Sequence, residues 1–445
     1  MRRRVSAQLQ LPDLGWRQEG RGYTFRVTPL SRRGGAPGPV PVVLLGGGLV
    51  FGLAAGAAWV AGRALRHNVS RDGSNNPRLI NWEWARAIAS RASAQDARMD
   101  GGDSGEAGSS VLDAARREAV QREYAQLIDR SVALVSEYTG ITLPAPLRKV
   151  HVFDRPEWVD ANLAQFRLMF APLDEAYAAT IVRARGAVPV GMMGQVMLSA
   201  QMGILMGYLA RRVLGQYDLS LLGREPVTEG RLYFVEPNIS AMVERFELPP
   251  EEFRAWIALH EVTHAFEFEA HPWVRDYMND LLTTYLGSLS EDLFHNRPGG
   301  ALTLLAGRIK DNLFERGHML EMMMSPRQRD VFRKLQALMA LMEGYSNHVM
   351  NQVGARHLKD HDTLKETFES RAKSRGVAEQ LFIKLTGLDI KLEQYVLGEK
   401  FCEQVASQRG LAFLNQIWQG PDHLPTLDEI HDADKWMARH QRIAA

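Results

Sequence analysis

The sequence predicts a predominantly helical α+β protein with a small sheet, preceded by a single transmembrane helix. Three observations carry this prediction. Apolar residues recur every 3.6 positions over most of the chain after residue 110, two short segments show the β-branched alternation of strands, and one uncharged stretch lies near the N-terminus. The 445 residues are 45% hydrophobic and 24% charged, which is an ordinary globular composition.

The charge balance and the cysteine count exclude several classes of protein. The chain has 53 Lys and Arg against 52 Asp and Glu, so its formal net charge is +1. No charge excess is available to attract nucleic-acid phosphates, and we expect no nucleic-acid partner. A single cysteine, Cys402, cannot form an intrachain disulfide or a CxxC pair.

The N-terminal 110 residues divide into three segments. Residues 1–41 combine an arginine-rich composition with a closing Gly/Pro cluster, which predicts a disordered basic tail. Residues 42–62 carry no charge and are long enough to cross a hydrocarbon core of roughly 30 Å, which predicts a single-pass membrane anchor. A buried helix is the alternative. Residues 63–110 have linker composition around a short amphipathic helix, NWEWARAIASRA.

The predicted anchor has two further features. Arginines flank it on both sides, so the sequence favours neither orientation in the membrane. Gly48, Gly52 and Gly56 repeat every four residues, a spacing that lets two helices approach closely in lipid. This predicts a homo-oligomer contact, although a glycine-rich composition alone explains the spacing equally well.

The main domain is predicted at 111–445. Strands are predicted at 148–154 and at 231–237, the second stopped by Pro237. We interpret the apolar residues of the second strand as core; an edge strand on which an extended peptide adds is the alternative. Helices are predicted at 111–138, 192–214, 251–270, 301–322, 328–353, 363–386 and 389–408.

The strongest functional motif is an HExxH pattern, His260-Glu261-Val262-Thr263-His264. Residues four apart lie on one face of a helix, so both imidazoles can bind one Zn²⁺ while Glu261 lies beside a water. Pro249 and Pro250 before an acidic first turn favour a helix here. Two core histidines with Glu261 as an ion-pair partner are the alternative.

A catalytic zinc site needs a third protein ligand, and Glu343 is the candidate. It falls four residues after Met339, on the apolar side of a predicted helix, where an unpaired carboxylate is costly and a metal would offset that cost. Pairing with an arginine or capping of a neighbouring helix is the alternative. His271 follows His264 by seven residues, which does not match the metzincin spacing.

Three residues close to Glu343 are candidates for supporting roles. His348 is a runner-up ligand or a polar group for the developing oxyanion. Asn347 and Tyr345 are further candidates for contacting the transition state or orienting a ligand, and Glu267 is a candidate for orienting an imidazole.

Six segments together resemble the zincin-like metallopeptidase type 2 family, which includes proteins associated with coenzyme F420 biosynthesis by genomic context. In chain order they are EYTGITLP, RRVLGQYDL, GRLYFVEPNIS, HEVTHAFEFEAHPW, EGYSNHVM and LEQYVLGEKF, and the likeness covers roughly residues 78–440. It implies a zincin-like helical domain with one zinc ion per chain. It also implies that His260 and His264 are ligands, that Glu261 is the catalytic acid, and that Glu343 is the third ligand, as in gluzincins.

Motif and resemblance together predict a membrane-anchored zinc metallohydrolase, with a peptidase acting on peptides or proteins as the leading hypothesis. In that mechanism zinc lowers the pKa of its water to around 7, and Glu261 accepts the proton and returns it to the leaving amine. One alternative is a non-catalytic zincin-fold protein that binds a partner in cofactor metabolism. Another is a zinc hydrolase acting on a non-peptide amide or ester.

Overall fold

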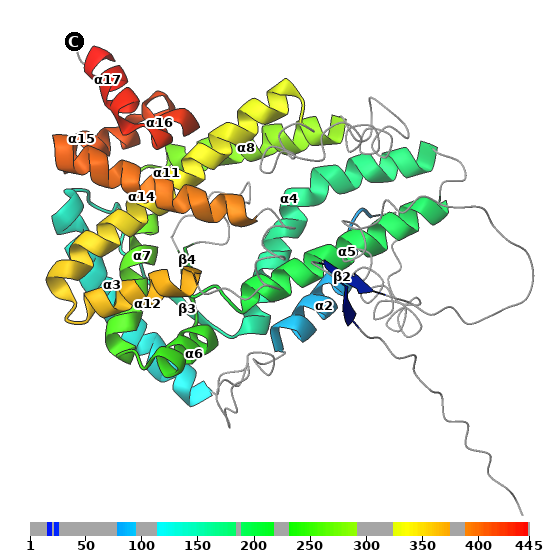
Figure 1. Cartoon of the computed structure of the whole chain (residues 1–445), viewed down its shortest axis with the longest axis horizontal. Coiled ribbons are helices and arrows are strands. Elements are labelled where there is room, and N and C mark those ends of the chain that lie inside the picture. Colours follow the sequence, from blue (N-terminus) through cyan, green and yellow to red (C-terminus); the bar gives the residue numbers. More distant parts are fainter. Residues whose placement is uncertain are drawn as a thin grey trace, which may run out of the picture. The chain divides into compact units, whose positions relative to one another are not determined.

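The computed structural model describes residues 16–19, 22–25, 78–94, 114–183, 188–217, 231–291, 324–373 and 388–443. Helices predominate in these ranges, and the strands form one two-stranded and one three-stranded sheet (Figure 1). This composition agrees with the predominantly helical α+β class that the periodicity predicts. The chain divides into two compact units, Met1–Gly52 and Leu53–Ala445.

The first unit contains a β-hairpin inside the range predicted as a disordered tail. Strands β1 (Trp16–Glu19) and β2 (Gly22–Phe25) pair antiparallel, with Trp16 opposite Phe25. A directly opposed aromatic pair of this kind stabilises a hairpin. The prediction of disorder rested on the arginine content of 1–41 and gave no weight to the aromatic residues between the arginines.

Several sequence predictions fall outside the described ranges. They include the membrane anchor at 42–62 with its three spaced glycines, and the helix at 301–322. Among the helices that the structure does describe, none combines the length and the apolar character needed to cross a bilayer.

The larger hydrophobic core of the second unit surrounds the helix that carries the HExxH motif. This helix, α7 (Pro250–Glu269), has a proline and two acidic residues in its first turn, which favour helix initiation. Helices α3 (Ala114–Thr139) and α11 (Pro326–His357) pack against it. Fully buried side chains of the three helices include Tyr124, Ile128, Phe253, Phe266 and Tyr345.

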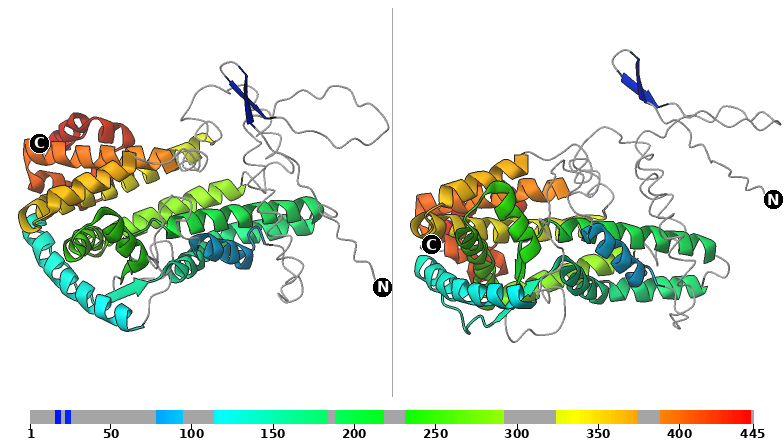
Figure 2. Two further views of the ribbon diagram at one scale, coloured as in Figure 1. Left: turned by 60° about the horizontal axis from the view of Figure 1, so that its bottom comes forward. Right: turned by 90° about the horizontal axis from the view of Figure 1, so that it is seen from below.

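Helix α14 (Leu388–Arg409) runs beside α11 (Figures 1 and 2). Two glycines allow the two backbones to touch. A Cβ atom on Gly398 would overlap the carbonyl of Ala340, and one on Gly344 would overlap the backbone of Gly398. This close approach holds α14 against the turn of α11 that carries Glu343, the candidate third ligand.

The three-stranded sheet has the order β3-β5-β4. Strand β3 (Lys149–Phe153) is parallel to the central strand β5 (Arg231–Val235), and β4 (Gly215–Tyr217) is antiparallel to it at the edge. Leu232 and Phe234 of β5 are fully buried. The interpretation of this segment as a core strand is therefore confirmed, and the edge position belongs to β4, which is too short for a recognisable sequence pattern.

A second, smaller core joins α2 (Trp82–Ala94), α4 (Arg155–Arg183) and α5 (Val188–Ala210). The short amphipathic helix predicted within 63–110 is confirmed as α2. Because α2 packs against α4 and α5, the folded body extends beyond the boundary predicted at residue 111. Helix α4 was missed by periodicity; it contains Pro172 and has no clear apolar face.

Most predicted helices of the body are confirmed within a few residues. The ranges 111–138, 192–214, 251–270, 328–353 and 389–408 correspond to α3, α5, α7, α11 and α14. Of the range 363–386, the described part forms α12 (His361–Lys373). Two further helices were not predicted, α6 (Glu236–Phe246), whose first turn contains the proline that ends β5, and α8 (Trp273–Ser290).

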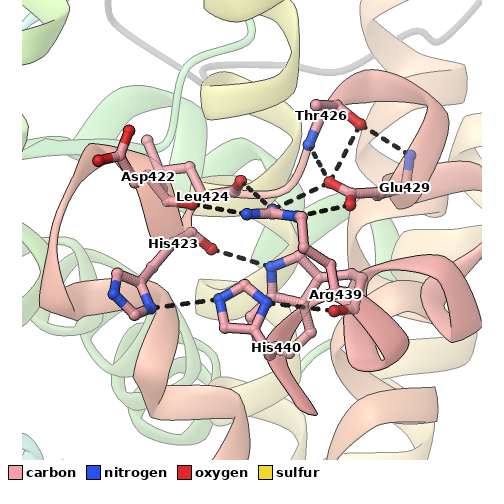
Figure 3. Close-up of polar contacts among 8 residues, drawn as sticks. Asp422, His423, Leu424, Thr426, Glu429, Arg439 and His440 are labelled. Atoms are coloured by element: carbon pink, nitrogen blue, oxygen red, sulfur yellow. Dashed lines mark hydrogen bonds and ion pairs between the residues drawn. The ribbon is translucent and has the colours of Figure 1, made fainter. Parts of the chain in front are cut away.

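The C-terminal segment folds back as short helices held by a polar cluster (Figure 3). Arg439 donates to the carboxylate of Glu429 and to two backbone carbonyls, while Thr426 and Glu429 form a capping box. His440 and His423 share a hydrogen bond of 3.2 Å. The elements are α15 (Leu411–Leu414), η3 (Asn415–Gln419), η4 (Pro421–His423), α16 (Leu427–His431) and α17 (Ala433–Ile443).

A buried ion pair ties α7 to its neighbours. The Arg254 guanidinium on α7 bonds to Glu236 on α6, whose side chain is fully buried, and to Glu123 on α3 at 3.1 Å. Tyr124 also donates to the Glu236 carboxylate, at 3.2 Å. The pair thereby fixes the start of the helix that carries the HExxH motif.

Replacing Arg254 with alanine is expected to lower the free energy of unfolding by about 3–5 kcal/mol, because it leaves the Glu236 charge buried without its partner. Urea unfolding of the metal-free protein measures this loss. Arg86→Ala is the matched control, since its ion pair with Asp160 is exposed and is worth less than about 1 kcal/mol. Equal effects of the two substitutions would contradict the assignment.

Candidate metal centre

Three of the predicted site residues converge on one point. His260 and His264 lie one turn apart on α7, and Glu343 reaches them from α11. One Glu343 carboxylate oxygen lies 3.6 Å from Nε2 of His260 and 4.0 Å from Nε2 of His264. The three ligand atoms all lie within 4.8 Å of one another. All three side chains are partly exposed, so the cluster is open to solvent on one side.

The chemistry and spacing of these donors fit a zinc ion. Two imidazole nitrogens and one carboxylate oxygen form a three-ligand set that leaves a fourth tetrahedral position open, as in catalytic zinc sites. Ligand atoms that bind one zinc ion at roughly 2 Å lie about 3.4 Å apart, close to the separations seen here. Without a cation, the Glu343 carboxylate and the Glu261 carboxylate would also repel each other across the site.

The orientation of His264 is fixed by two buried partners. Its Nδ1 lies 2.8 Å from Oε2 of Glu267 and 3.1 Å from the hydroxyl of Ser346 on α11. The Ser346 hydroxyl also donates to Oε1 of Glu267, at 3.1 Å. This arrangement favours the tautomer with the proton on Nδ1, which leaves Nε2 available to a metal. Ser346 and Glu343 lie three residues apart on α11, so one helix supplies both a ligand and a support for another ligand.

Removing the Ser346 hydroxyl tests this support. Ser346→Ala is expected to lower the zinc affinity about 10 to 100-fold, because His264 loses one of the two contacts that orient its ring. Competition with a chelator of known zinc affinity measures the change. Ser288→Ala on α8, whose hydroxyl donates to the carbonyl of Tyr285, is the control and should leave the affinity unchanged. An unaltered affinity in Ser346→Ala would show that Glu267 alone orients the ring.

Carboxylates around His264 strongly favour its protonated form. Burial opposes protonation, but the charge and hydrogen bond of Glu267, together with the charges of Glu343 and Glu261, raise the pKa of His264 to about 10. In the metal-free protein at neutral pH the imidazole therefore carries a second proton, which must leave before Nε2 binds a metal.

Zinc binding at pH 7 is accordingly expected to release about one proton from His264, and the zinc affinity is expected to rise about tenfold per pH unit up to a pH of about 10. The affinity rises with pH because the pKa of His264 lies above the working pH, so protons compete with zinc for its Nε2. Calorimetric titrations in two buffers of different ionisation enthalpy count the protons. Glu267→Gln should reduce the count. A pH-independent affinity would contradict the assignment.

Glu261 lies beside the cluster, pressed against the edge strand β4. Its side chain is only 6% exposed. Burial raises its pKa, whereas the charges of His260 and His264 and a hydrogen bond from the backbone N–H of Tyr217 oppose the rise. A Cβ atom on Gly215 would lie 2.6 Å from a Glu261 carboxylate oxygen, so any side chain at this position would displace the carboxylate.

The other predicted residues lie away from the three donors or make different contacts. His348 bonds to the hydroxyl of Tyr138 at 3.0 Å and lines a cavity of about 640 Å³ between α3, α11 and α14. Burial lowers its pKa to about 4, so it is neutral at pH 7. Tyr345 is fully buried and donates to Asn415 at 2.8 Å. Asn347 is half-buried one turn after Glu343, on the same side of α11.

Glu269 and His271, which follow the motif, make other contacts. Glu269 accepts a hydrogen bond from the hydroxyl of Tyr217 and lies 3.5 Å from Arg275. His271 stacks on Trp418 at a ring separation of 5.3 Å, and burial lowers its pKa to about 4. Neither residue belongs to the cluster of three donors formed by His260, His264 and Glu343.

Gly215, Tyr217 and Ser346 contact the site, but none of them was among the candidate site residues predicted from the sequence. Ser346 shares a helix face with Glu343, and this spacing is the one available clue. Gly215 and Tyr217 belong to a three-residue strand whose partners on α7 are distant in sequence; Tyr217 and Glu269 are 52 residues apart.

Comparison with known proteins agrees with the geometry. A family model described as zincin-like metallopeptidase matches residues 80–437. Among solved structures, the chain is similar to a "putative hydrolase with a novel fold" from Chloroflexus aurantiacus, with 38% sequence identity and a TM-score of 0.57. That similarity covers 82% of this chain and 99% of the other. No curated protein matches the sequence. The family match spans most of the chain, and the chain therefore belongs to the zincin-like metallopeptidase family.

Proposed function

We propose that this protein is a zinc-dependent peptidase in which His260, His264 and Glu343 hold the ion and Glu261 is the general base. The observation that carries the proposal is the convergence of two imidazoles and a carboxylate from separate helices beside a buried glutamate. A zinc ion held there supplies a Lewis acid that acidifies a water and polarises a carbonyl.

Glu261 performs the proton transfers in this scheme. Its carboxylate accepts a proton from the attacking water while the water oxygen bonds to the scissile carbonyl carbon. When the carbon–nitrogen bond breaks, Glu261 gives the same proton to the leaving amine and returns to its ionised form. The residue therefore needs to be ionised and held in one orientation at the start of each turnover.

The position of β4 at the edge of the sheet favours a peptide as the substrate. Among the described strands β4 pairs with β5 alone and lies at the edge of the sheet, and its Gly215 lies directly beside Glu261. An extended peptide that adds to a sheet edge gains main-chain hydrogen bonds without a requirement for particular side chains. We place the scissile bond near Gly215, next to the base.

Hydrolysis of a randomised peptide library by the zinc-loaded full chain tests the proposal, with product termini identified by mass spectrometry. We expect cleavage that stops when a chelator removes zinc and resumes when zinc is restored. Stoichiometric zinc without cleavage of any peptide would contradict it and would favour the non-catalytic alternative, a partner-binding role.

We further propose that residues 42–62 anchor the protein to a membrane as a single span and that Gly48, Gly52 and Gly56 pair two copies there. The uncharged length and the glycine spacing support this. Flotation of the full chain with liposomes, compared with a chain lacking residues 1–62, tests the anchor; equal recovery of both in the lipid fraction would contradict it.

A further inference from the structure

We infer that β4 is a positioning strand for Glu261, in which Gly215 leaves the space that the carboxylate occupies and the Tyr217 side chain locks the strand to α7 and α8. The inference rests on the proposed role of Glu261 as the base. It assigns to Gly215 and Tyr217 a function that the motif does not contain.

The sheet register determines which β4 amides face the site. The N–H of Val235 donates to the carbonyl of Leu214 at 2.9 Å, which makes these two residues a hydrogen-bonded pair. In antiparallel strands such pairs alternate, so Gln216 bonds to Tyr233 while the N–H groups of Gly215 and Tyr217 point away from β5. The Tyr217 amide therefore points to the side of β4 opposite β5, where it can donate to the Glu261 carboxylate.

Gly215 provides the space for the carboxylate. A Cβ atom there would lie 2.6 Å from Oε1 and 2.7 Å from Cγ of Glu261. The obstructing atoms belong to the end of one side chain, so a larger residue would displace Glu261 rather than unfold the strand. Glycine at this position therefore preserves the orientation of the base.

The Tyr217 side chain fixes the strand from the other end. Its hydroxyl donates to Glu269 on α7 and accepts from Arg275 on α8 at 3.3 Å, and its ring stacks on Phe268 at 5.5 Å. The Tyr217 side chain is buried, with 3% exposure. Because the HExxH helix also carries Glu269, the strand and the base are held to the same rigid element.

A similar network elsewhere in the protein offers a matched control. Tyr124 donates to Glu236, which pairs with Arg254, so this trio has the same chemistry as Tyr217, Glu269 and Arg275. Both tyrosines are buried, yet Tyr124 makes no contact with Glu261 in the described structure. Removing either hydroxyl costs a comparable buried hydrogen bond, and only Tyr217 is linked to the base.

Amide hydrogen exchange tests the contact between β4 and Glu261 without any assay of hydrolysis. In the full chain, loaded with zinc, Glu261→Ala is expected to accelerate exchange of the Tyr217 amide about tenfold or more, since a hydrogen bond to a carboxylate is lost. The Gln216 amide should keep its wild-type rate. Gly215→Ala, which displaces the carboxylate, should have the same effect on Tyr217. Unchanged exchange at Tyr217, or equal acceleration at Gln216, would overturn the inference.

Steady-state kinetics supply the second arm, with a peptide that the wild type cleaves. Tyr217→Phe is expected to lower kcat about 10 to 100-fold at unchanged KM and zinc content, because the base is misplaced. Tyr124→Phe should leave kcat unchanged. Equal losses in both variants, or none in Tyr217→Phe, would contradict the positioning role. If the wild type cleaves nothing, the proposed function fails. The exchange measurement still decides whether β4 holds Glu261.

Discussion

Glu343→Ala and His264→Ala should each lose zinc when dialysed against a buffer that leaves the wild type with about one ion per chain. Each substitution removes one of the three proposed protein donors, and the expected fall in affinity exceeds the 10 to 100-fold typical of residues that merely support a ligand. Metal analysis of the dialysed proteins measures the content. Competition with a chelator then gives the affinities.

The control for this experiment is Glu251→Ala, which removes an exposed carboxylate from the first turn of the same helix. It should keep zinc at the wild-type level. Full zinc retention in Glu343→Ala would show that Glu343 is not a ligand. It would then support the alternative in which this carboxylate only pairs with a neighbouring basic side chain.

Glu261→Gln is expected to lower the rate of hydrolysis by about 10² to 10⁴-fold while zinc stays bound. Glutamine has the same shape, and its amide oxygen can still accept the hydrogen bond from the Tyr217 backbone, so the side chain remains in place. It cannot accept a proton from water. The loss should therefore appear in kcat, measured with the peptide that the wild type cleaves best.

Zinc content and unfolding free energy should match the wild type in this variant, because Glu261 is not one of the three donors. A rate close to that of the wild type would remove Glu261 from the proton-transfer step. Loss of zinc together with activity would mean that Glu261 is itself a ligand, and the roles of the two glutamates would have to be exchanged.

The convergence of the three candidate metal donors was predictable because it depends on local spacing. Two histidines four apart must share a helix face, and an acid on the apolar side of another helix must find a partner. Both rules hold whatever the tertiary fold. The structure adds the distance between the two helices, which arises from the glycine contact of α11 with α14 and from the packing of α11 on α7.

The contacts of strand β4 with Glu261 were not predictable from the sequence. Strand β4 has three residues, fewer than a period-two pattern needs, and its role depends on which amides the sheet leaves unpaired. Helix α4 was missed because Pro172 interrupts its sequence pattern without ending the helix. In both places tertiary packing decides the structure where local propensity gives no clear preference.

His348 illustrates the limit of counting along one helix. It follows Glu343 by five residues, which turns it about 140° around the axis. The structure accordingly directs it to Tyr138 and a separate cavity. Ser346, three residues after Glu343, lies on the nearer face and meets His264.

The most direct test of the account is anomalous diffraction at the zinc absorption edge from crystals of the zinc-loaded protein. The account predicts one strong peak at roughly 2 Å from Nε2 of His260, Nε2 of His264 and a carboxylate oxygen of Glu343, with Glu261 beside it but not coordinating. A peak at a different set of side chains, or none under conditions in which zinc is bound in solution, would contradict it.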